Sequence, residues 1–149
     1  MTDQEIELLL NAALKDMFYS VLRLQEQSVS RLANGSLSRT EMHAMEIVQD
    51  IPEATLTQIA DILGITKATV SVSVSRLVEK GYLEKTRSES DGRKSILRLT
   101  EEGETMCKKH KQFHDMLIGS VMREFNVSQY PEVLKSLQAL VNFFNHLRV

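Results

Sequence analysis

The sequence is poor in residues that would point to several other classes of protein. It has one cysteine, Cys107, two prolines and no tryptophan. A single cysteine excludes an intrachain disulfide framework and suits a reducing cytoplasm, where we expect the protein to be. No apolar run reaches membrane-spanning length, and no signal-peptide pattern is found. We therefore expect one globular domain of ordinary size, with no membrane partner.

Motifs of catalysis are also lacking. The sequence holds no glycine-rich phosphate loop, no cysteine–histidine arrangement with a third orienting group, and no metal-binding motif. The serines between residues 71 and 75 have no suitable base close by in the sequence. We expect no enzymatic activity and no cofactor.

Positive charge is scarce overall but concentrated in one segment. The chain carries a net charge of −2, which argues against a generally basic nucleic-acid binder. Residues 66–99 hold eight cations and four acids, so this segment is +4 and the remainder of the chain is −6. This asymmetry is expected of a DNA-binding module, although a solvated charged hairpin would also produce it.

Residues 55–81 have the pattern of a helix-turn-helix. Thr55 and Gln58 form a capping box, and apolar residues at helical spacing follow them. Gly64 is a suitable left-handed stop, and the oxygen of Thr66 can cap the next helix. Two short helices that meet at a glycine are typical of this motif.

The second helix of the motif is predicted to have one apolar and one polar face. Valines and a leucine form the first face (Val70, Val74, Leu77, Val78), and the second consists of Lys67, Thr69, Ser71, Ser73, Ser75 and Arg76. The Val–Ser alternation over residues 70–74 also matches a strand, but the preceding cap and the later helical spacing favour a helix. Hydroxyls and cations suit a major groove, so the predicted DNA contacts are Lys67, Thr69, Ser71, Ser75 and Arg76.

A β-hairpin is predicted directly after this helix. Strand-like runs cover residues 83–87 and 94–99, with an Asp-Gly turn signal between them. A hairpin here makes the motif winged, and an arginine at its tip suits the negative potential of the minor groove. We assign Arg93 to that groove, Asp91 to orienting the turn or Arg93, and Lys94 to the same wing.

The first part of the chain predicts two helices. Residues 5–33 have apolar residues at every third or fourth position and contain no proline or glycine. Residues 38–41 are a second capping box, and the helix that follows is apolar nearly all round, hence buried, until Pro52 stops it. Backbone N–H groups at helix starts favour anions, so we assign phosphate contacts to Ser38, Thr57 and Gln58.

The last part of the chain predicts two more helices. Thr100 is expected to cap a helix that ends near residue 125, and Ser128 a helix with Pro131 in its first turn. The terminal helices have more apolar surface than a small winged core can cover. We predict a mainly helical α+β fold, a winged helix-turn-helix whose long terminal helices intertwine in a homodimer. The expected parts are residues 1–34 and 101–149 for dimerisation and 36–100 for DNA binding.

The segment ITKATVSVSVSRLVEKGYLEKTRSESDGRKSILRLTEEG resembles the recognition helix and wing of MarR-type transcriptional regulators. Within that family the chain is most similar to FabT-type repressors of fatty-acid synthesis, through Glu41-Met42-His43, Arg87-Ser88-Glu89 and residues 110–114. The resemblance implies a dimeric repressor with a long-chain acyl group on acyl carrier protein as corepressor. Two-fold symmetry predicts a pseudo-palindromic operator in double-stranded DNA, with half-sites about 10 base pairs apart.

Alternatives to this interpretation remain open. An adaptable apolar pocket for an effector is expected among Phe18, Leu22, Met42, His43, Met45 and Phe113, although such residues are usually core. The regulator would otherwise sense another small molecule, or a metal through His110 and His114, whose spacing suits a ligand pair. No nearby carboxylate cluster completes that site in the sequence, so two solvated or hydrogen-bonded histidines are favoured. Cys107 is interpreted as inert and not as a redox sensor. A winged-helix adaptor that binds proteins and no DNA is the alternative from another class.

Overall fold

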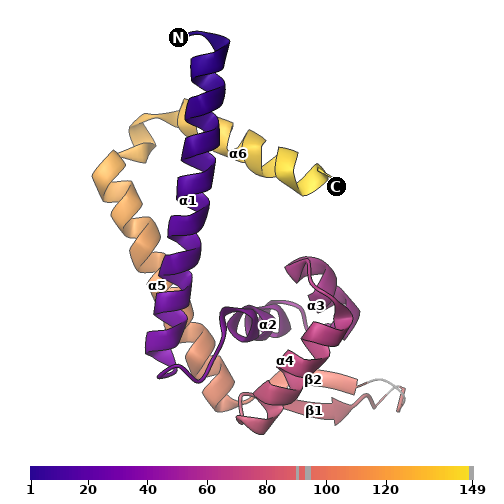
Figure 1. Cartoon of the computed structure of the whole chain (residues 1–149). Helices are drawn as coiled ribbons and strands as arrows, with labels where there is room; N and C mark the ends of the chain where they lie inside the picture. Colours follow the sequence, from indigo (N-terminus) through magenta and orange to yellow (C-terminus); the bar gives the residue numbers. More distant parts are fainter. Residues whose placement is uncertain (90, 93–94, 148–149) are drawn as a thin grey trace. The chain divides into compact units, whose positions relative to one another are not determined.

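The structure is a computed structural model that describes residues 1–89, 91–92 and 95–147. It is mainly helical with a two-stranded hairpin, as predicted (Figure 1). The elements in chain order are α1 (Asp3–Leu32), α2 (Arg39–Asp50), α3 (Leu56–Leu63), α4 (Lys67–Glu79), β1 (Leu83–Arg87), β2 (Ser95–Leu99), α5 (Glu101–Phe125), a 3₁₀ turn (Val127–Gln129) and α6 (Pro131–His146). Over the described residues, no helix combines the length and apolar character needed to cross a membrane.

Two compact units make up the chain, Met1–His110 and Lys111–Val149, and their boundary falls inside α5. The first unit contains α1, the three helices that follow it, the hairpin and the start of α5. We call residues 38–99 of this unit the reading head. The second unit consists of the rest of α5, the 3₁₀ turn and α6.

Capping boxes fix the starts of the first three helices. In each, a hydroxyl oxygen accepts the N–H of the residue three positions later, whose side chain accepts the N–H of the capping residue in return. The pairs are Thr2 with Glu5, Ser38 with Glu41, and Thr55 with Gln58. Each box satisfies two N–H groups that a helix start leaves without an intrahelical partner. The boxes at Ser38 and Thr55 were predicted from the sequence, and the box at Thr2 was not.

Gly64 closes the turn between α3 and α4. It adopts the left-handed conformation with φ 64° and ψ 33°, which a glycine reaches without steric cost. The N–H of Ile65 then bonds to the carbonyl of Ala60 at 3.1 Å, and Thr66 caps α4 by accepting the N–H of Thr69. The valine–serine run is therefore helical, and the predicted helix-turn-helix is confirmed.

The buried face of α4 differs from the predicted one. Its buried residues are Val70, Ser73, Val74 and Leu77. This spacing of three, four and seven positions is a single helical stripe, and Ser73 falls on it. The assignment of Ser73 to the polar face was therefore wrong. Val78, predicted on the apolar face, is 38% exposed, and Val72 is 51% exposed on the opposite side.

The hairpin pairs antiparallel, with Leu83 opposite Leu99 and Arg87 opposite Ser95. Leu83, Ile96 and Leu97 are buried and dock it on the helices. The first strand has the predicted bounds. The second was predicted from residue 94, which lies outside the described residues.

Thr100 joins the hairpin to α5 and caps that helix, as predicted. Its N–H bonds to the carbonyl of Tyr82 at 3.1 Å, and its hydroxyl donates to the carbonyl of Gly81 at 2.6 Å. The same hydroxyl accepts the N–H of Gly103 at 3.1 Å. Gly103 lies so close to this turn that a Cβ there would clash with the Tyr82 carbonyl oxygen and lie 3.0 Å from Leu99 Cδ2.

The core of the first unit is built around α2. Six of the twelve residues of α2 are buried, which confirms the predicted buried helix. Large, fully buried side chains of this core include Met42, Met45, Ile59, Leu77 and Leu83. The helix α1 contributes Val29, and α5 contributes Met106 and Cys107. The reading head is thus held by apolar contacts from every helix that adjoins it.

The start of α6 was predicted wrongly. Ser128 does not cap this helix but lies in the 3₁₀ turn, and α6 begins at Pro131 with no side-chain cap. Proline lacks an N–H and has a helix-compatible φ, so it can begin a helix without a capping side chain. The position of Pro131 in the first turn is as predicted.

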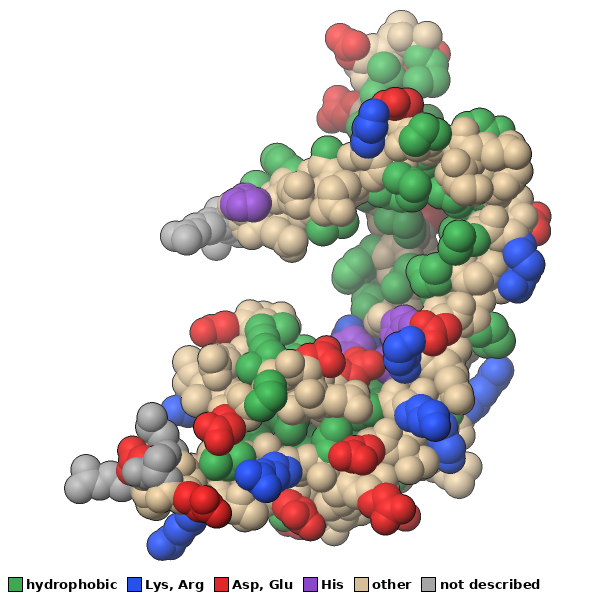
Figure 2. Space-filling model, turned by 180° about the vertical axis from the view of Figure 1, so that it is seen from behind, with side chains coloured by type: hydrophobic (Ala, Val, Ile, Leu, Met, Phe, Trp, Pro, Cys, Tyr) green, Lys and Arg blue, Asp and Glu red, His purple; other side chains and the backbone are tan. Residues whose placement is uncertain are grey.

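The terminal helices expose much apolar surface. None of the residues of α6 is buried, and α1 buries only Val29. Figure 2 shows hydrophobic side chains on the surface outside the reading head. Exposed examples are Leu9, Met17 and Phe18 on α1, Met116, Val121 and Met122 on α5, and Leu134, Leu137, Val141 and Phe144 on α6.

Candidate nucleic-acid interface

The outer face of α4 presents all five residues predicted to contact DNA. The side chains of Lys67, Thr69, Ser71, Ser75 and Arg76 are exposed. At 100° per residue they form two rows, Lys67, Ser71 and Ser75 on one side and Thr69 and Arg76 on the other. Val72 lies between the rows and was not among the predicted contacts. An exposed valine in such a place can contact a thymine methyl group.

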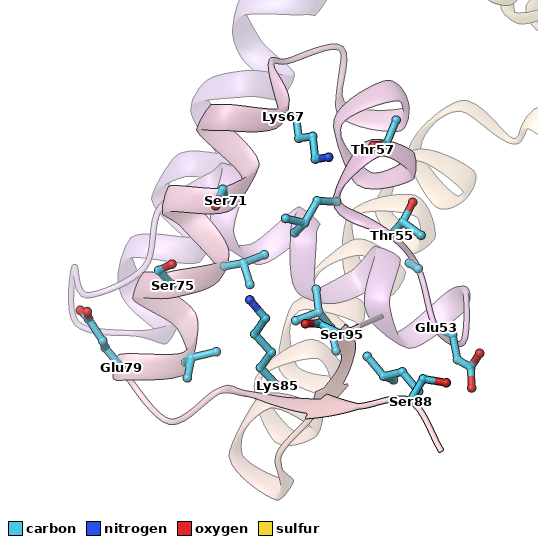
Figure 3. A pocket seen from close by; sticks show the side chains of 16 residues that line it. Glu53, Thr55, Thr57, Lys67, Ser71, Ser75, Glu79, Lys85, Ser88 and Ser95 are labelled. Carbon is cyan, nitrogen blue, oxygen red and sulfur yellow. The ribbon is translucent and has the colours of Figure 1, made fainter. Parts of the chain in front are cut away.

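A hollow of about 600 Å³ lies beside α4, between that helix, the start of α3 and the hairpin (Figure 3). Lys67 from α4 and Lys85 from β1 both point into it. Hydroxyl groups of Thr55, Thr57, Ser71 and Ser75 also line it. Cations and hydroxyls that converge in this way can hold a phosphate group.

Lys85 was not among the predicted contact residues, although a signal for it exists. Side chains two positions apart in a strand share a face. Lys85 is therefore on the same side of β1 as the buried Leu83, which faces the helices.

Glu53 and Glu79 border the same hollow and would repel a phosphate placed near them.

The wing is described only in part. The N–H of Asp91 bonds to the hydroxyl of Ser88 at 3.3 Å, a local contact that shapes the turn. Arg93 and Lys94, predicted for the minor groove and the wing, lie outside the described residues. Their roles stay predictions, as does the role of Asp91 in orienting Arg93.

The residues predicted to contact phosphates lie at helix starts. Ser38 and Gln58 are both engaged in capping boxes, through the hydroxyl oxygen of Ser38 and the amide oxygen of Gln58. Thr57 is exposed in the first turn of α3 and lines the hollow with Lys67 (Figure 3). Of the three, Thr57 therefore lies closest to the cations of the interface.

The residues predicted for an effector pocket differ in their environments. Met42 and Met45 are fully buried in the core of the first unit. His43 and Leu22 are half-buried, and Phe18 is 59% exposed on α1. Phe113 is half-buried on the part of α5 that belongs to the second unit. Whether they line a pocket stays a prediction.

His110 is fully buried and contacts a carboxylate. Its Nδ1 lies 2.6 Å from Glu46 Oε1 of α2, and its ring centroid lies 5.9 Å from that of His43. No carboxylate cluster near this histidine was expected from the sequence, and the structure brings one carboxylate, that of Glu46, to it. Glu46 is 64 residues away in sequence and comes close only because α2 packs against α5. The favoured interpretation of His110 as a hydrogen-bonded histidine agrees with this contact.

Cys107 is buried in the core one turn before His110. Burial, together with the nearby carboxylates of Glu46, Asp50 and Glu104, raises the pKa of its thiol to about 12. The thiol is therefore protonated at neutral pH, and only the thiolate reacts readily. The adjacent lysines do not lower this pKa, and the inert interpretation agrees with the structure.

Comparison with known proteins finds sequence relatives of the segment that contains most of the reading head. Residues 36–94 match the MarR family model. The HTH-type transcriptional regulator YhjH of Bacillus subtilis is 31% identical over 91 residues, which are 61% of this chain and 52% of that protein. The HTH-type transcriptional regulator BilQ of Clostridioides difficile is 30% identical over 51% of each chain. Each match thus spans about half the length of the relative.

Solved structures extend the likeness to the terminal helices. The crystal structure of Streptococcus pneumoniae FabT in complex with DNA has a TM-score of 0.87 and is 29% identical, covering 95% of this chain and 99% of that one. The MarR family transcription regulator SP03579 has a TM-score of 0.80 at 17% identity over 95% and 93% of the chains, which shows the fold alone. The chain is therefore similar to MarR family transcription regulators, in sequence over residues 36–94 and in its winged helix-turn-helix fold over nearly its whole length.

Proposed function

We propose that the protein is a sequence-specific DNA-binding transcriptional repressor of the MarR type. The main support is the outer face of α4, where hydroxyls and cations point away from the core beside a hollow that receives Lys67 and Lys85. This arrangement combines groups that read base edges with groups that hold phosphates. FabT, similar to this chain over nearly its whole length, has been crystallised with DNA, which supports the same use of this face.

The protein is proposed to act as a homodimer that joins through residues 1–34 and 101–149. The support is the apolar surface of α1, the second half of α5 and α6. Burying one large aliphatic or aromatic side chain contributes about 1.5–3 kcal/mol, so even a few of these residues favour association. In a symmetric dimer the two α4 helices meet successive major grooves of a pseudo-palindromic operator, with half-sites about 10 base pairs apart.

The regulated genes are proposed to be those of fatty-acid synthesis, with long-chain acyl-acyl carrier protein as corepressor. The support is the similarity to FabT and the sequence segments at residues 41–43, 87–89 and 110–114 that resemble that type. A corepressor acts by binding the DNA-bound conformation more tightly than the free one. The candidate pocket residues with which we associate it are Phe18, Leu22, Met42, His43, Met45 and Phe113.

A gel shift tests both the proposed DNA binding and the proposed role in fatty-acid synthesis. Duplexes from the protein's own promoter and from a fatty-acid synthesis promoter are titrated with the protein, with and without long-chain acyl-acyl carrier protein. We expect binding to both duplexes, strengthened by the acylated carrier and not by the unacylated one. Binding that does not respond to the acylated carrier would refute the fatty-acid role and leave the DNA-binding role intact.

The salt dependence of the same assay separates a DNA-binding regulator from a protein–protein adaptor. With about 6–10 phosphate contacts, affinity falls roughly 10³–10⁵-fold between 50 and 200 mM salt. An adaptor would bind neither duplex at any salt concentration. Shuffled duplexes of equal length serve as controls for sequence specificity.

Metal-dependent regulation is a second candidate function. The contact between Glu46 and His110 supplies the carboxylate that the histidine pair lacked in the sequence. His114 follows one turn later on α5. Histidine nitrogens and carboxylate oxygens are ligands that zinc accepts. Operator binding by wild type and His110→Gln is compared with added zinc and with a chelator; equal binding by wild type in both conditions would exclude this candidate.

A further inference from the structure

Lys80 follows the last residue of α4, and its ammonium group is held at the start of α2. Nζ donates to Glu41 Oε1 and Oε2, each at 2.9 Å, and to the carbonyl oxygen of Ser36 at 2.6 Å. An ammonium group has three N–H donors, so these acceptors match its capacity. The side chain of Lys80 is 31% exposed and that of Glu41 only 3%. The carboxylate is therefore withdrawn from water, whereas the lysine stays partly exposed.

Glu41 serves two helices at once. Its Oε2 accepts the N–H of Ser38 at 2.9 Å and so completes the capping box of α2, while both oxygens accept from Lys80. One buried carboxylate thus holds the start of α2 and the end of α4 together. Removal of the lysine alone would leave this carboxylate buried without a cation, which is much more costly than the loss of an exposed ion pair.

Ser36 connects the same cluster to the chain that leaves α1. It lies in the short turn between α1 and α2, where its N–H bonds to the carbonyl of Ala33 at 2.9 Å and Gly35 has φ 75°. The Lys80 contact to this turn spans 44 residues of sequence. It joins the end of the recognition helix to the end of the long N-terminal helix.

On its other side, Lys80 leads directly into the wing. Gly81 adopts φ 78°, and the N–H of Tyr82 bonds to the carbonyl of Leu77 at 2.9 Å before β1 begins at Leu83. The chain from α4 to β1 is therefore a tight turn with little freedom. A fixed position of Lys80 fixes both the recognition helix and the base of the hairpin.

We propose that Lys80, Glu41 and the Ser36 carbonyl form a positioning cluster that sets α4 and the wing against the turn after α1, so that operator binding depends on it without a contact between Lys80 and DNA. The proposal rests on the proposed DNA-binding function and not on the fatty-acid role. Because Glu41 already compensates the charge of Lys80, the lysine adds little to counterion release from DNA.

Four variants test the cluster: Lys80→Met, Lys80→Arg, Glu41→Gln, and Lys111→Met as the matched control. Lys111 also pairs with a carboxylate, Asp115 at 2.6 Å, but both side chains are exposed. Because Lys111 lies in the segment proposed for dimerisation, the oligomeric state of Lys111→Met is first shown to equal that of wild type. Each variant is titrated against the operator duplex and against a shuffled duplex, over a series of salt concentrations. Thermal unfolding of each variant ensures that binding is measured on folded protein.

We expect Lys80→Met to lower operator affinity about tenfold, within the usual range of couplings between sites. Affinity for the shuffled duplex and the salt slope should stay as in wild type, Lys80→Arg should restore most of the operator affinity, and Lys111→Met should change nothing. A salt slope reduced by about one would assign Lys80 to a phosphate and overturn the proposal. Unchanged operator affinity in a less stable Lys80→Met would also overturn it, because the role would then be stability alone.

Hydrogen exchange of the free protein tests the cluster without DNA. Lys80→Met should speed the exchange of the amides of Ser36 and Tyr82, whose hydrogen bonds lie on either side of Lys80. Unchanged exchange at both amides would overturn the cluster even if the protein bound its operator. If the amides exchange faster in Lys80→Met but the wild-type protein binds no duplex, the cluster is supported and the DNA-binding function is refuted.

Discussion

Replacement of Gly103 by alanine is expected to destabilise the protein, although this substitution normally strengthens a helix. Alanine is favoured over glycine in a helix interior by about 1 kcal/mol. At Gly103 the new methyl group would clash with the carbonyl oxygen of Tyr82 and lie 3.0 Å from Leu99 Cδ2. The main obstacle is backbone, which is held by the N–H of Thr100 at 3.1 Å and cannot rotate aside as a long side chain can.

The expected loss in the free energy of unfolding of Gly103→Ala is the sum of three contributions. Overpacking that forces a backbone shift costs about 1–3 kcal/mol. If the shift pulls the Thr100 N–H from the Tyr82 carbonyl, an acceptor left buried without a partner costs about 1–3 kcal/mol more. After subtraction of the gain in helix propensity, we expect Gly103→Ala to lower the free energy of unfolding by about 3 kcal/mol.

Gly119→Ala in the same helix is the matched control. A Cβ at Gly119 would meet only a side-chain nitrogen of Arg123, at 3.4 Å. It should therefore keep the usual gain and stabilise the protein by up to about 1 kcal/mol. Urea unfolding is compared at equal protein concentration, because an associating chain gains stability with concentration. A Gly103→Ala protein as stable as wild type, or both variants shifted in the same direction, would refute the close approach of α5 to Tyr82.

Three further predictions concern the cap of α2, the buried thiol and the wing. Ser38→Ala should lower the free energy of unfolding by about 1 kcal/mol in urea titrations, through loss of the cap, and an unchanged midpoint would contradict this. The raised pKa of Cys107, about 12 against its usual 9.0, should make the native thiol react slowly with iodoacetamide at pH 8 and quickly once urea unfolds the protein. Because this pKa is higher in the folded protein, the contribution of the thiol to the free energy of unfolding is constant below pH 9 and is lost as the pH rises toward 12. Arg93→Ala should weaken operator binding in gel shifts and reduce the salt slope by about one, whereas unchanged affinity would exclude Arg93 from the interface.

The features of the fold that were predicted correctly depend on interactions between residues a few positions apart. The capping boxes at Ser38 and Thr55, the left-handed Gly64 and the cap at Thr66 each involve groups within four positions of one another. Such contacts form within one turn of chain, so the sequence pattern determines them almost directly. The choice of helix over strand for residues 70–74 also succeeded for this reason, because the cap precedes the ambiguous run.

The parts that were missed depend on packing between distant elements. Glu41 and Lys80 are 39 residues apart, and Glu46 and His110 are 64 apart. Spacing along the chain carries no information about such pairs until the faces of α2 are known. The burial of Ser73 has the same origin, since a small polar residue on the packed stripe of α4 looks identical in sequence to one on the outer face.

These distant pairs connect α2 to the end of α4 and to α5 within the first unit. Its N-terminal carboxylate, Glu41, binds Lys80 at the end of the recognition helix, and Glu46 contacts His110 on α5. Between them, Met42 and Met45 are fully buried, and a packed core element moves as a body and does not deform locally. A ligand that altered the contact of His110 with Glu46 would therefore act on α4 through a displacement of α2. Under this reasoning, Lys80→Met should weaken the response of operator binding to any effector that acts at His110, as well as operator binding itself.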